Sequence, residues 1–211
     1  MPPMEKRRLG RPRDTTSDET RERVLLAARD CFSQYGYNKT TNKDIAAAAG
    51  ITTGAIYHYF ESKQSLFAAV TAEVNDVVFD EFERVVAEQD AFVDKLHALL
   101  DAASRLHAND RSLARFSATF PVELNRHPEL RESLKDADIT RSRRFFRRLA
   151  DEAKTKGELP ADMSATDISN MITTLTIGLA YFGTIVDSAR VHRAAVVTIE
   201  KLLERGLRNG T

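Results

Sequence analysis

Residues 40–63, TTNKDIAAAAGITTGAIYHYFESK, constrain the fold more than any other part of this chain. The alanine-rich run after Thr41 favours a helix, and Thr41 forms a capping-box pair with Asp44 at its start. Gly50 can take the left-handed backbone conformation that ends such a helix. Thr52 can then cap a second, shorter helix. The stretch therefore predicts two short helices joined by a tight turn.

Helix, glycine turn and short helix is the arrangement that places a recognition helix in the DNA major groove. In the second helix, residues 53–60, Ile56 and Phe60 share one face and are expected to be buried. The same pattern would also fit an ordinary helical hairpin in a bundle. A purely structural helix has little use for the tyrosines, histidine and threonines of this segment, so DNA binding is the favoured interpretation.

The motifs T-x-x-D-I-A-x-x-A-G, I-T-x-G-x-I-Y-x-Y-F and S-K-x-x-L follow one another here without insertion. In this order they resemble the signature of the TetR family of bacterial transcriptional repressors. The resemblance covers about residues 18–70, and beyond them only length and helical character agree. It implies an all-α fold of about nine helices. Residues 18–63 would form a three-helix helix-turn-helix DNA-binding domain, and residues 64–211 a larger helical effector-binding and dimerisation domain.

The resemblance also implies specific DNA contacts. Tyr57, His58 and Tyr59 match family positions that contact DNA, and Thr41 and Lys63 match positions that contact phosphates. Lys63 falls in the first turn of a helix, where a cation is mildly unfavourable. A nearby phosphate would explain its presence there.

Small side chains form the start of the recognition helix, at Thr52, Thr53, Gly54 and Ala55. Such residues allow close approach to base edges and phosphates. Gly54 and Ala55, however, have no hydrogen-bonding side chain, so direct readout of bases is expected to be thin. DNA shape and basic residues elsewhere are then expected to supply part of the specificity.

Residues 1–17 are rich in Pro, Gly and Arg and have almost no apolar content, so they are expected to be a disordered basic arm. The segment LGRPR is similar to the Gly-Arg-Pro unit of AT-hooks. A proline-stiffened chain can lay Arg8, Arg11 and Arg13 into a narrow minor groove. A solubilising basic tail is the alternative, and the position directly before a helix-turn-helix favours the DNA contact.

The charge distribution agrees with DNA binding although the net charge is zero. Residues 1–65 carry eleven Lys and Arg against eight Asp and Glu, whereas the remainder carries twenty against twenty-three. The positive bias therefore lies in the half with the helix-turn-helix, as phosphate binding requires.

Composition and hydropathy favour a helical cytoplasmic protein without a membrane partner. Helix-forming residues dominate, and the single cysteine, Cys31, suits a reducing compartment and is expected to be a small buried hydrophobe. No apolar segment of a signal peptide follows the basic N-terminus. The longest apolar stretch, residues 168–186, is interrupted by polar residues and glycines, which favours a buried bundle helix over a membrane span.

Apolar residues at helical spacing predict the other helices. Their expected ranges are residues 18–35, 64–87, 90–107, 113–120, 129–156, 167–188 and 192–207. Pro121 is expected to end the helix before it. Five arginines at 141–148 could bind nucleic acid, but they spread around their helix, which favours a solvated face or the rim of a ligand portal.

The last two predicted helices are expected to form a homodimer interface. The first of them is apolar nearly all round, which favours burial against a second subunit. In the family, the last two helices of each subunit form half of a four-helix interface. A two-fold dimer can also bind a palindromic operator, whereas one short helix contacts too few base pairs.

A small-molecule site is expected inside the C-terminal domain, although for any single one of its residues plain core is the favoured interpretation. Apolar side chains with scattered threonines favour a largely apolar effector. The predicted lining is Phe82, Leu99, Ala103, Phe116, Phe120, Phe146, Ile172, Leu175, Leu179 and Tyr181.

The sequence contains no recognisable catalytic motif, and no enzyme activity, metal or cofactor is expected. The five histidines form no H-E-x-x-H or Cys/His cluster, and G-x-S-x-G, P-loop and Rossmann patterns are absent. Three interpretations remain. The leading one is a ligand-responsive DNA-binding repressor, and the others are a small-molecule-binding module with vestigial DNA contact and a nucleoid-type protein with only non-specific binding.

Overall fold

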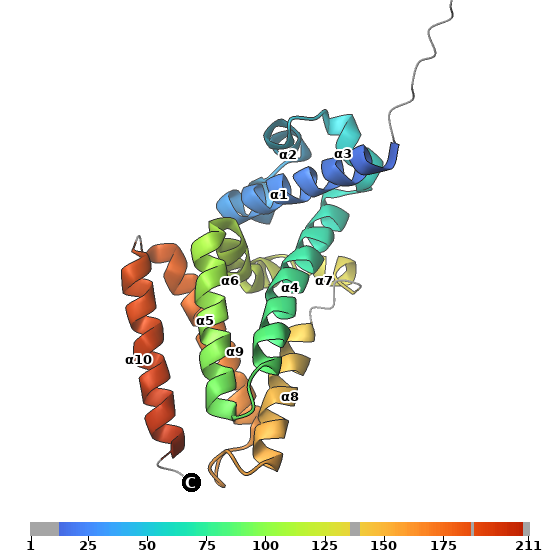
Figure 1. The fold of residues 1–211 in the computed structure, drawn as a ribbon. Helices are drawn as coiled ribbons and strands as arrows, with labels where there is room; N and C mark the ends of the chain where they lie inside the picture. Colours follow the sequence, from blue (N-terminus) through green and yellow to red (C-terminus); the bar gives the residue numbers. More distant parts are fainter. Residues whose placement is uncertain (1–12, 136–139, 187, 209–211) are drawn as a thin grey trace, which may run out of the picture.

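All regular secondary structure in the described residues, 13–135, 140–186 and 188–208 of the computed structural model, is helical (Figure 1). The predicted all-α fold is confirmed, with ten helices in these residues where about nine were predicted. In chain order they are α1 (Arg13–Lys39), α2 (Asn42–Ala49), α3 (Thr53–Tyr59), α4 (Lys63–Ala87), α5 (Phe92–Asn109), α6 (Arg111–Arg126), α7 (Leu130–Ser133), α8 (Arg141–Thr155), α9 (Ala165–Ile185) and α10 (Ala189–Arg208).

Helices α1, α2 and α3 lie together at one end of the molecule, and α4 runs from them into the C-terminal body (Figure 1). Their core contains Phe32 of α1, Ile45 of α2, Ile56 of α3 and Phe67 of α4. Cys31 is buried in the same core, as predicted. Apolar side chains of α6 also enter it, because the Phe67 ring lies 5.5 Å from the Phe116 ring between centroids. The helix-turn-helix is therefore packed directly against the C-terminal body.

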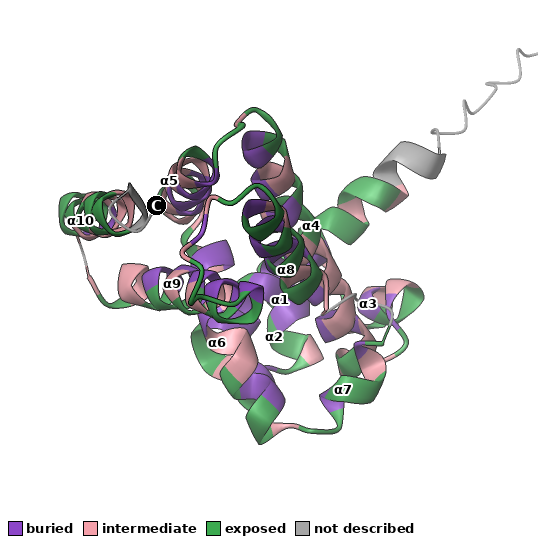
Figure 2. Cartoon of the chain, turned by 90° about the horizontal axis from the view of Figure 1, so that it is seen from below, coloured by how far each residue is buried: buried purple, intermediate pink, exposed green. Residues whose placement is uncertain are grey.

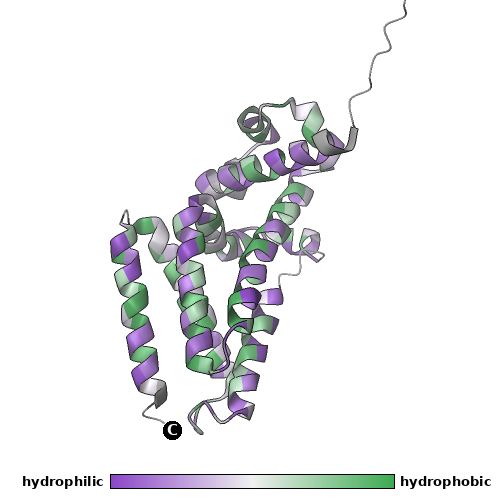
Figure 3. Cartoon of the chain, in the orientation of Figure 1, coloured by the Kyte–Doolittle hydropathy of each residue, from purple (hydrophilic) through white to green (hydrophobic). Residues whose placement is uncertain are grey.

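The C-terminal body is built around α4, α5, α8 and α9. Its centre holds four phenylalanines, Phe79, Phe82, Phe145 and Phe146, whose ring centroids lie between 5.4 and 6.5 Å apart. Helix α10 packs against α5 and α9 at the edge of the molecule and is exposed along most of its length (Figure 2). Hydrophilic and hydrophobic bands alternate along α5 and α10, as expected for amphipathic helices (Figure 3).

Several predicted helix boundaries are wrong. Helix α1 begins at Arg13, inside the segment predicted to be a disordered arm, and not at residue 18. Helix α6 does not end at Pro121 but continues to Arg126. Proline has no N–H to donate to the carbonyl of Ser117, a defect that costs about 3 kcal/mol in a helix interior. Burial of Leu124 beyond the proline, and the hydrogen bond that buried Glu123 accepts from the Tyr37 amide, favour continuation of the helix. The predicted continuous helix over 129–156 is instead two helices, α7 and α8, and residues 136–139 between them lie outside the described residues.

Helix α9 is long and apolar enough, by length and composition alone, to cross a membrane. In this structure it packs against α5, α6 and α8, but only 28% of its most apolar window is buried. Three of its large apolar side chains, Ile177, Tyr181 and Ile185, are exposed in a single chain. The predicted bundle helix is thus only partly covered within one subunit.

Candidate DNA-binding and effector sites

The first helix of the helix-turn-helix begins at a complete capping box. The Thr41 hydroxyl accepts a hydrogen bond from the Asp44 amide at 3.2 Å. In return, the Thr41 amide and hydroxyl donate to the Asp44 carboxylate at 3.0 and 2.6 Å. These bonds lower the pKa of Asp44. Both polar groups of Thr41 are therefore used within the chain.

The turn between α2 and α3 has the predicted geometry. Gly50 adopts φ 65° and ψ 36°, and its amide donates to the carbonyls of Ala46 and Ala47. Thr52 caps α3 by accepting a hydrogen bond from the Ala55 amide at 3.2 Å. A left-handed residue at this position favours glycine because a Cβ atom would be strained there.

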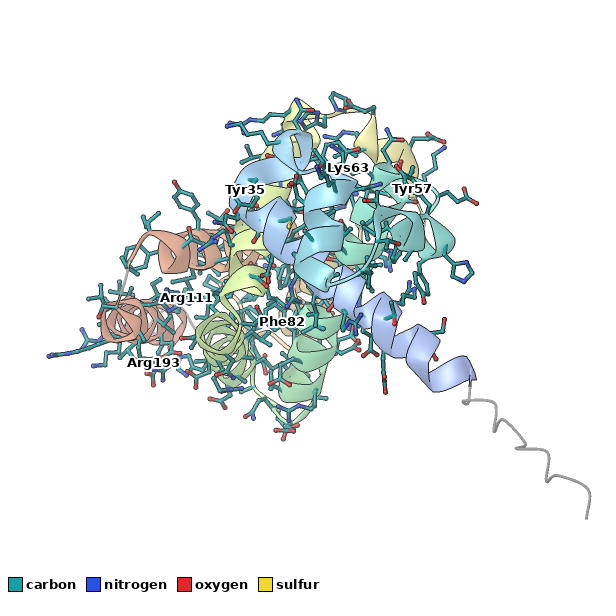
Figure 4. The ribbon with its side chains drawn as sticks, turned by 90° about the horizontal axis from the view of Figure 1, so that it is seen from above. Tyr35, Tyr57, Lys63, Phe82, Arg111 and Arg193 are labelled. Carbon is teal, nitrogen blue, oxygen red and sulfur yellow. The ribbon has the colours of Figure 1, made fainter. Side chains whose placement is uncertain are left out.

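Burial orients α3. Ile56 and Phe60 are buried in the core, as predicted, whereas Thr52, Gly54, Tyr57 and His58 are exposed. Tyr57 has 55% of its surface exposed and points away from the body (Figure 4). The outer face of α3 therefore presents a free tyrosine, a histidine and a glycine together.

Three further predicted residues of α3, Thr53, Ala55 and Tyr59, are half-buried. The Tyr59 hydroxyl accepts a hydrogen bond from Ser17 of α1 at 3.5 Å. Tyr59 also packs against the core of the domain, so it positions α3 on α1. Arg8 and Arg11 lie outside the described residues, and only the backbone of Arg13 is described.

The Lys63 ammonium has partners within the chain. Its Nζ donates to the carbonyl oxygens of Tyr37 and Thr40, both at 3.0 Å, and lies 4.3 Å from the centroid of the Tyr37 ring. These carbonyls belong to the C-terminal end of α1, where a helix favours a cation. The unexpected lysine at the start of α4 is thus accounted for by α1.

Two lysines beside the capping box escaped the sequence prediction. Lys39 at the end of α1 and Lys43 in the first turn of α2 are exposed. Among the described residues neither ammonium has a hydrogen-bond or ion-pair partner. Their signal in the sequence is local positive charge close to Thr41, which the family pattern does not mark.

An apolar cavity of about 210 Å³ lies in the C-terminal body, between α4, α5, α6, α8 and α9. Of the predicted residues, Phe82, Ala103, Phe116, Phe120 and Phe146 line it. Phe82 is buried among the helices (Figure 4). The polar atoms at the wall of the cavity come from Thr71, Asn75, His107, Ser117, Ser142, Thr173 and Thr176.

The other five predicted residues do not line this cavity. Leu99, Ile172 and Leu179 are buried in the adjacent core, Leu175 is half-buried, and Tyr181 is 55% exposed. Helix α9 instead turns Thr173, Thr176, Ile177 and Ala180 toward the cavity. Successive residues of a helix are rotated by about 100° around its axis. A shift of one residue therefore changes which face of α9 meets the cavity, and the prediction chose the wrong face.

Helix α6 bonds to α1 at two points. Near its start, Arg29 of α1, only 4% exposed, donates to Ser112 at 2.9 Å and to Glu73 of α4 at 3.3 Å, and it also ion-pairs with Asp110. Asp110 is the residue that caps α6. Near its end, the carboxylate of buried Glu123 accepts a hydrogen bond from the Tyr37 amide at 3.0 Å.

Gly36 makes the second contact possible. It breaks α1 with φ 79° and ψ 166°, at the glycine where the predicted helix ends. A Cβ atom there would lie 3.2 Å from the Glu123 carboxylate oxygen, closer than most such contacts. The break in α1 and the end of α6 thus fit together only with glycine.

Comparison with known proteins identifies the family. The family model described as bacterial regulatory proteins, tetR family, matches residues 24–70. The model described as BetI-type transcriptional repressor, C-terminal, matches residues 92–208. The chain belongs to the TetR family of transcriptional regulators, and its C-terminal part is of the BetI repressor type.

Individual relatives agree in fold and length. The transcriptional regulator UidR of Escherichia coli K12 is 28% identical over 165 residues, which cover 78% of this chain and 82% of the relative. GusR of Salmonella enterica is 26% identical with a TM-score of 0.72, covering 93% of this chain and 100% of that structure. The fatty acid degradation regulator FadR of Bacillus halodurans shares the fold, with a TM-score of 0.74 at 23% identity over 90% of this chain and 96% of that one.

Proposed function

We propose that this protein is a cytoplasmic, homodimeric repressor that binds a palindromic operator through α3 and is released by a small, largely apolar effector. The observation that carries this proposal is the position of α6. Helix α6 lines the effector cavity with Phe116 and Phe120, and it is bonded to α1 through Asp110 at its start and Glu123 near its end.

The exposed face of α3 supplies the DNA contact in this proposal. Tyr57 and His58 would lie in the major groove, and the small residue Gly54 allows the backbone close to the bases. Lys39 and Lys43 would bind phosphates, since their ammonium groups are unpaired in the described part of the chain. Lys63 would contribute to DNA binding indirectly, by holding the start of α4 against the end of α1 through its hydrogen bonds to the Tyr37 and Thr40 carbonyls.

The cavity sets the size of the effector. Its volume of about 210 Å³ is only somewhat larger than the roughly 150 Å³ that holds one benzene molecule in an apolar protein interior. A compact ring-bearing molecule fits this space, whereas a long acyl chain, such as the stearoyl group bound to FadR of Bacillus subtilis, would need a larger one.

Coupling would run through α6. An effector that moves Phe116 or Phe120 acts on the Phe67 ring, whose centroid lies 5.5 and 6.2 Å from theirs. It also acts on Asp110 and Glu123, which hold α1. Because packed elements move between discrete arrangements, a small shift of α6 would change the separation of the two α3 helices in a dimer.

The exposed stripe of α9 supports the homodimer. Ile177, Tyr181 and Ile185 recur every four residues along one face and are 42%, 55% and 61% exposed. Val191 and Leu202 of α10 are also exposed. Apolar stripes of this kind favour burial against a second copy.

A fluorescence-anisotropy titration tests the proposal. Purified protein is titrated onto labelled DNA from upstream of its own gene and onto scrambled DNA, at two salt concentrations. Tight, sequence-selective binding at physiological salt is expected, and small apolar compounds are then screened for release.

Equal, salt-sensitive binding to both DNAs would favour a nucleoid-type protein, once genome-wide selection has also failed to yield a preferred site. Absence of binding to any DNA at low salt would contradict the proposal. The protein would then be a small-molecule-binding module.

A further inference from the structure

A second cavity, of about 170 Å³, lies beside the apolar one. It is enclosed by the end of α5, the start of α6 and the junction between α9 and α10. Its wall is polar, and the side chains that matter are Ser104, His107, Arg111, Arg115, Thr184 and His192. Figure 4 places Arg111 beside the last two helices.

The described residues that line this cavity carry positive charge, from Arg111, which is exposed, and Arg115, which is half-buried. Among the described residues, neither the Arg111 nor the Arg115 guanidinium has a hydrogen-bond or ion-pair partner, and no Asp or Glu lines the cavity. An unpaired guanidinium at a partly enclosed site offers strong, paired N–H donors to an anion. Arg111 and Arg115 are one turn apart on α6 and both line this cavity.

His192 has a fixed protonation pattern. Its Nε2 lies 3.0 Å from the Leu179 carbonyl oxygen and its Nδ1 lies 3.4 Å from the Ser104 hydroxyl. Because a carbonyl oxygen only accepts, Nε2 carries the proton. Nδ1 of a neutral His192 is then left as the acceptor for Ser104.

His107 joins the two cavities, because it lines both. Burial, and then the neighbouring His192, lower the pKa of His107 to about 4, so its ring is neutral near pH 7. Its Nδ1 is buried without a hydrogen-bond partner. A buried polar atom of this kind is expected to find a partner, and a group of a ligand that passes from one cavity to the other would supply it.

We propose that the effector is an amphipathic acid, whose apolar body fills the cavity at Phe82, Phe116 and Phe146 and whose anionic head lies between Arg111 and Arg115. This inference rests on the proposed function and names the chemical class of its effector. A neutral head would leave both guanidiniums without a counter-charge, whereas a carboxylate accepts from both. His107 hydrogen-bonds the linking or head group.

Matched pairs of acids and neutral amides test the charge requirement. The probes are benzoate and benzamide, 3-phenylpropionate and its amide, 2-naphthoate and 2-naphthamide, and decanoate and decanamide. Binding is measured by titration calorimetry on the full chain without DNA, since the protein contains no tryptophan to report binding by fluorescence. At least one acid is expected to bind about tenfold or more tightly than its amide, as charged hydrogen bonds imply.

The double variant Arg111→Gln and Arg115→Gln is expected to abolish this preference while leaving amide binding unchanged. The matched control is Arg131→Gln with Arg143→Gln, which removes the same charge from two exposed arginines of α7 and α8. The control should keep the full preference. Circular dichroism and thermal unfolding confirm that both double variants fold.

Three results would overturn the inference. The first is that no acid in the series binds more tightly than its amide. This result is also expected if a carboxylate of a second copy occupied the guanidiniums. The preference could persist in the Arg111 and Arg115 variant, or disappear equally in the control. Because no DNA is present, these outcomes are separate from a failure of the repressor proposal, which would appear as absent operator binding or absent release.

Discussion

At the scale of single residues, two predicted phosphate contacts have structural partners of their own. Thr41 and Asp44 cap α2, and Lys63 bonds to the last carbonyls of α1. The side chains left free for phosphates next to them are Lys39 and Lys43. A short motif records which residue types recur at a position, but it does not separate a residue that binds DNA from one that holds the binding helix in place.

Replacing Lys63 and Lys43 separates these roles. Lys63→Gln is expected to lower the free energy of unfolding by about 1–3 kcal/mol, because two charge-assisted hydrogen bonds are lost. Lys43→Gln should leave stability unchanged, weaken binding to all DNA sequences alike and make the salt dependence shallower by about one charge. Urea unfolding and anisotropy at several salt concentrations measure the two effects. Unchanged stability of Lys63→Gln together with a shallower salt slope would assign the phosphate contact to Lys63.

His107 gives stability a defined pH dependence. Its pKa is about 4 in the folded chain and about 6.5 when unfolded. Between these values the unfolded chain binds a proton that the folded chain does not, so stability falls as pH drops from about 6.5 to 4 and is unaffected by this group above that window. The loss reaches about 3 kcal/mol at the lower end.

His107→Gln should remove that component of the acid sensitivity. The check is urea unfolding of wild type and variant at intervals from pH 7.5 to 4. His58→Gln, at an exposed position of α3, serves as the control and should keep the wild-type profile. An identical fall in wild type and His107→Gln would show that the His107 ring titrates normally.

At the scale of elements, α2, α3 and the start of α4 were predictable because their determinants are local. Thr41, Gly50 and Thr52 act on backbone within a few residues, and each has the predicted capping role. Ser62 caps the start of α4 equally locally. The boundaries of the other helices depend on packing between residues far apart in the sequence. Pro121 lies inside α6 since the buried residues after it hold the helix together.

The effector cavity shows the same division at the level of side chains. The sequence marked aromatic residues that line it, such as Phe82 and Phe146, because large apolar side chains belong in the interior. It could not set the rotation of α9, which depends on how α5, α6 and α8 pack around that helix. His107 lies on α5, whereas Arg111 and Arg115 lie on α6, and the sequence could not show that these helices bring the three residues to one cavity.

Gly54→Ala tests the DNA-facing side of α3 with little structural change. An added Cβ would meet only the Thr52 hydroxyl oxygen, at 3.9 Å, and alanine should stabilise the helix by about 0.5–1 kcal/mol. Operator affinity is nevertheless expected to fall about tenfold, comparable to one mismatched base pair, because the methyl group lies where the backbone approaches the bases. Non-specific binding should change much less. Unaltered operator affinity in a stabilised variant would move the contact away from Gly54.

At the scale of the whole molecule, one chain leaves an apolar face open on α9 and holds its DNA-binding helices through α6. Ile185→Glu should shift the protein to a monomer in sedimentation velocity without unfolding it, since this side chain is 61% exposed. Operator binding should weaken strongly because one half-site is lost. Val122→Glu, on an exposed position of α6, is the control and should stay dimeric. A dimer that survives Ile185→Glu would place the interface elsewhere.

The link between effector and operator is expected to pass through Asp110 and Arg29. Asp110→Asn keeps a good cap for α6 but removes the negative charge that pairs with Arg29 of α1. Operator affinity without effector should be nearly unchanged, whereas the fold-change in affinity on adding the effector should shrink about fivefold or more, about 1 kcal/mol of coupling. Anisotropy titrations with and without the tightest-binding acid measure this ratio. By reciprocity the operator should then change acid affinity by the same reduced factor. If Asp110→Asn lowered stability but left the ratio intact, the contact would be structural only, and coupling would have to pass through the Phe67, Phe116 and Phe120 rings.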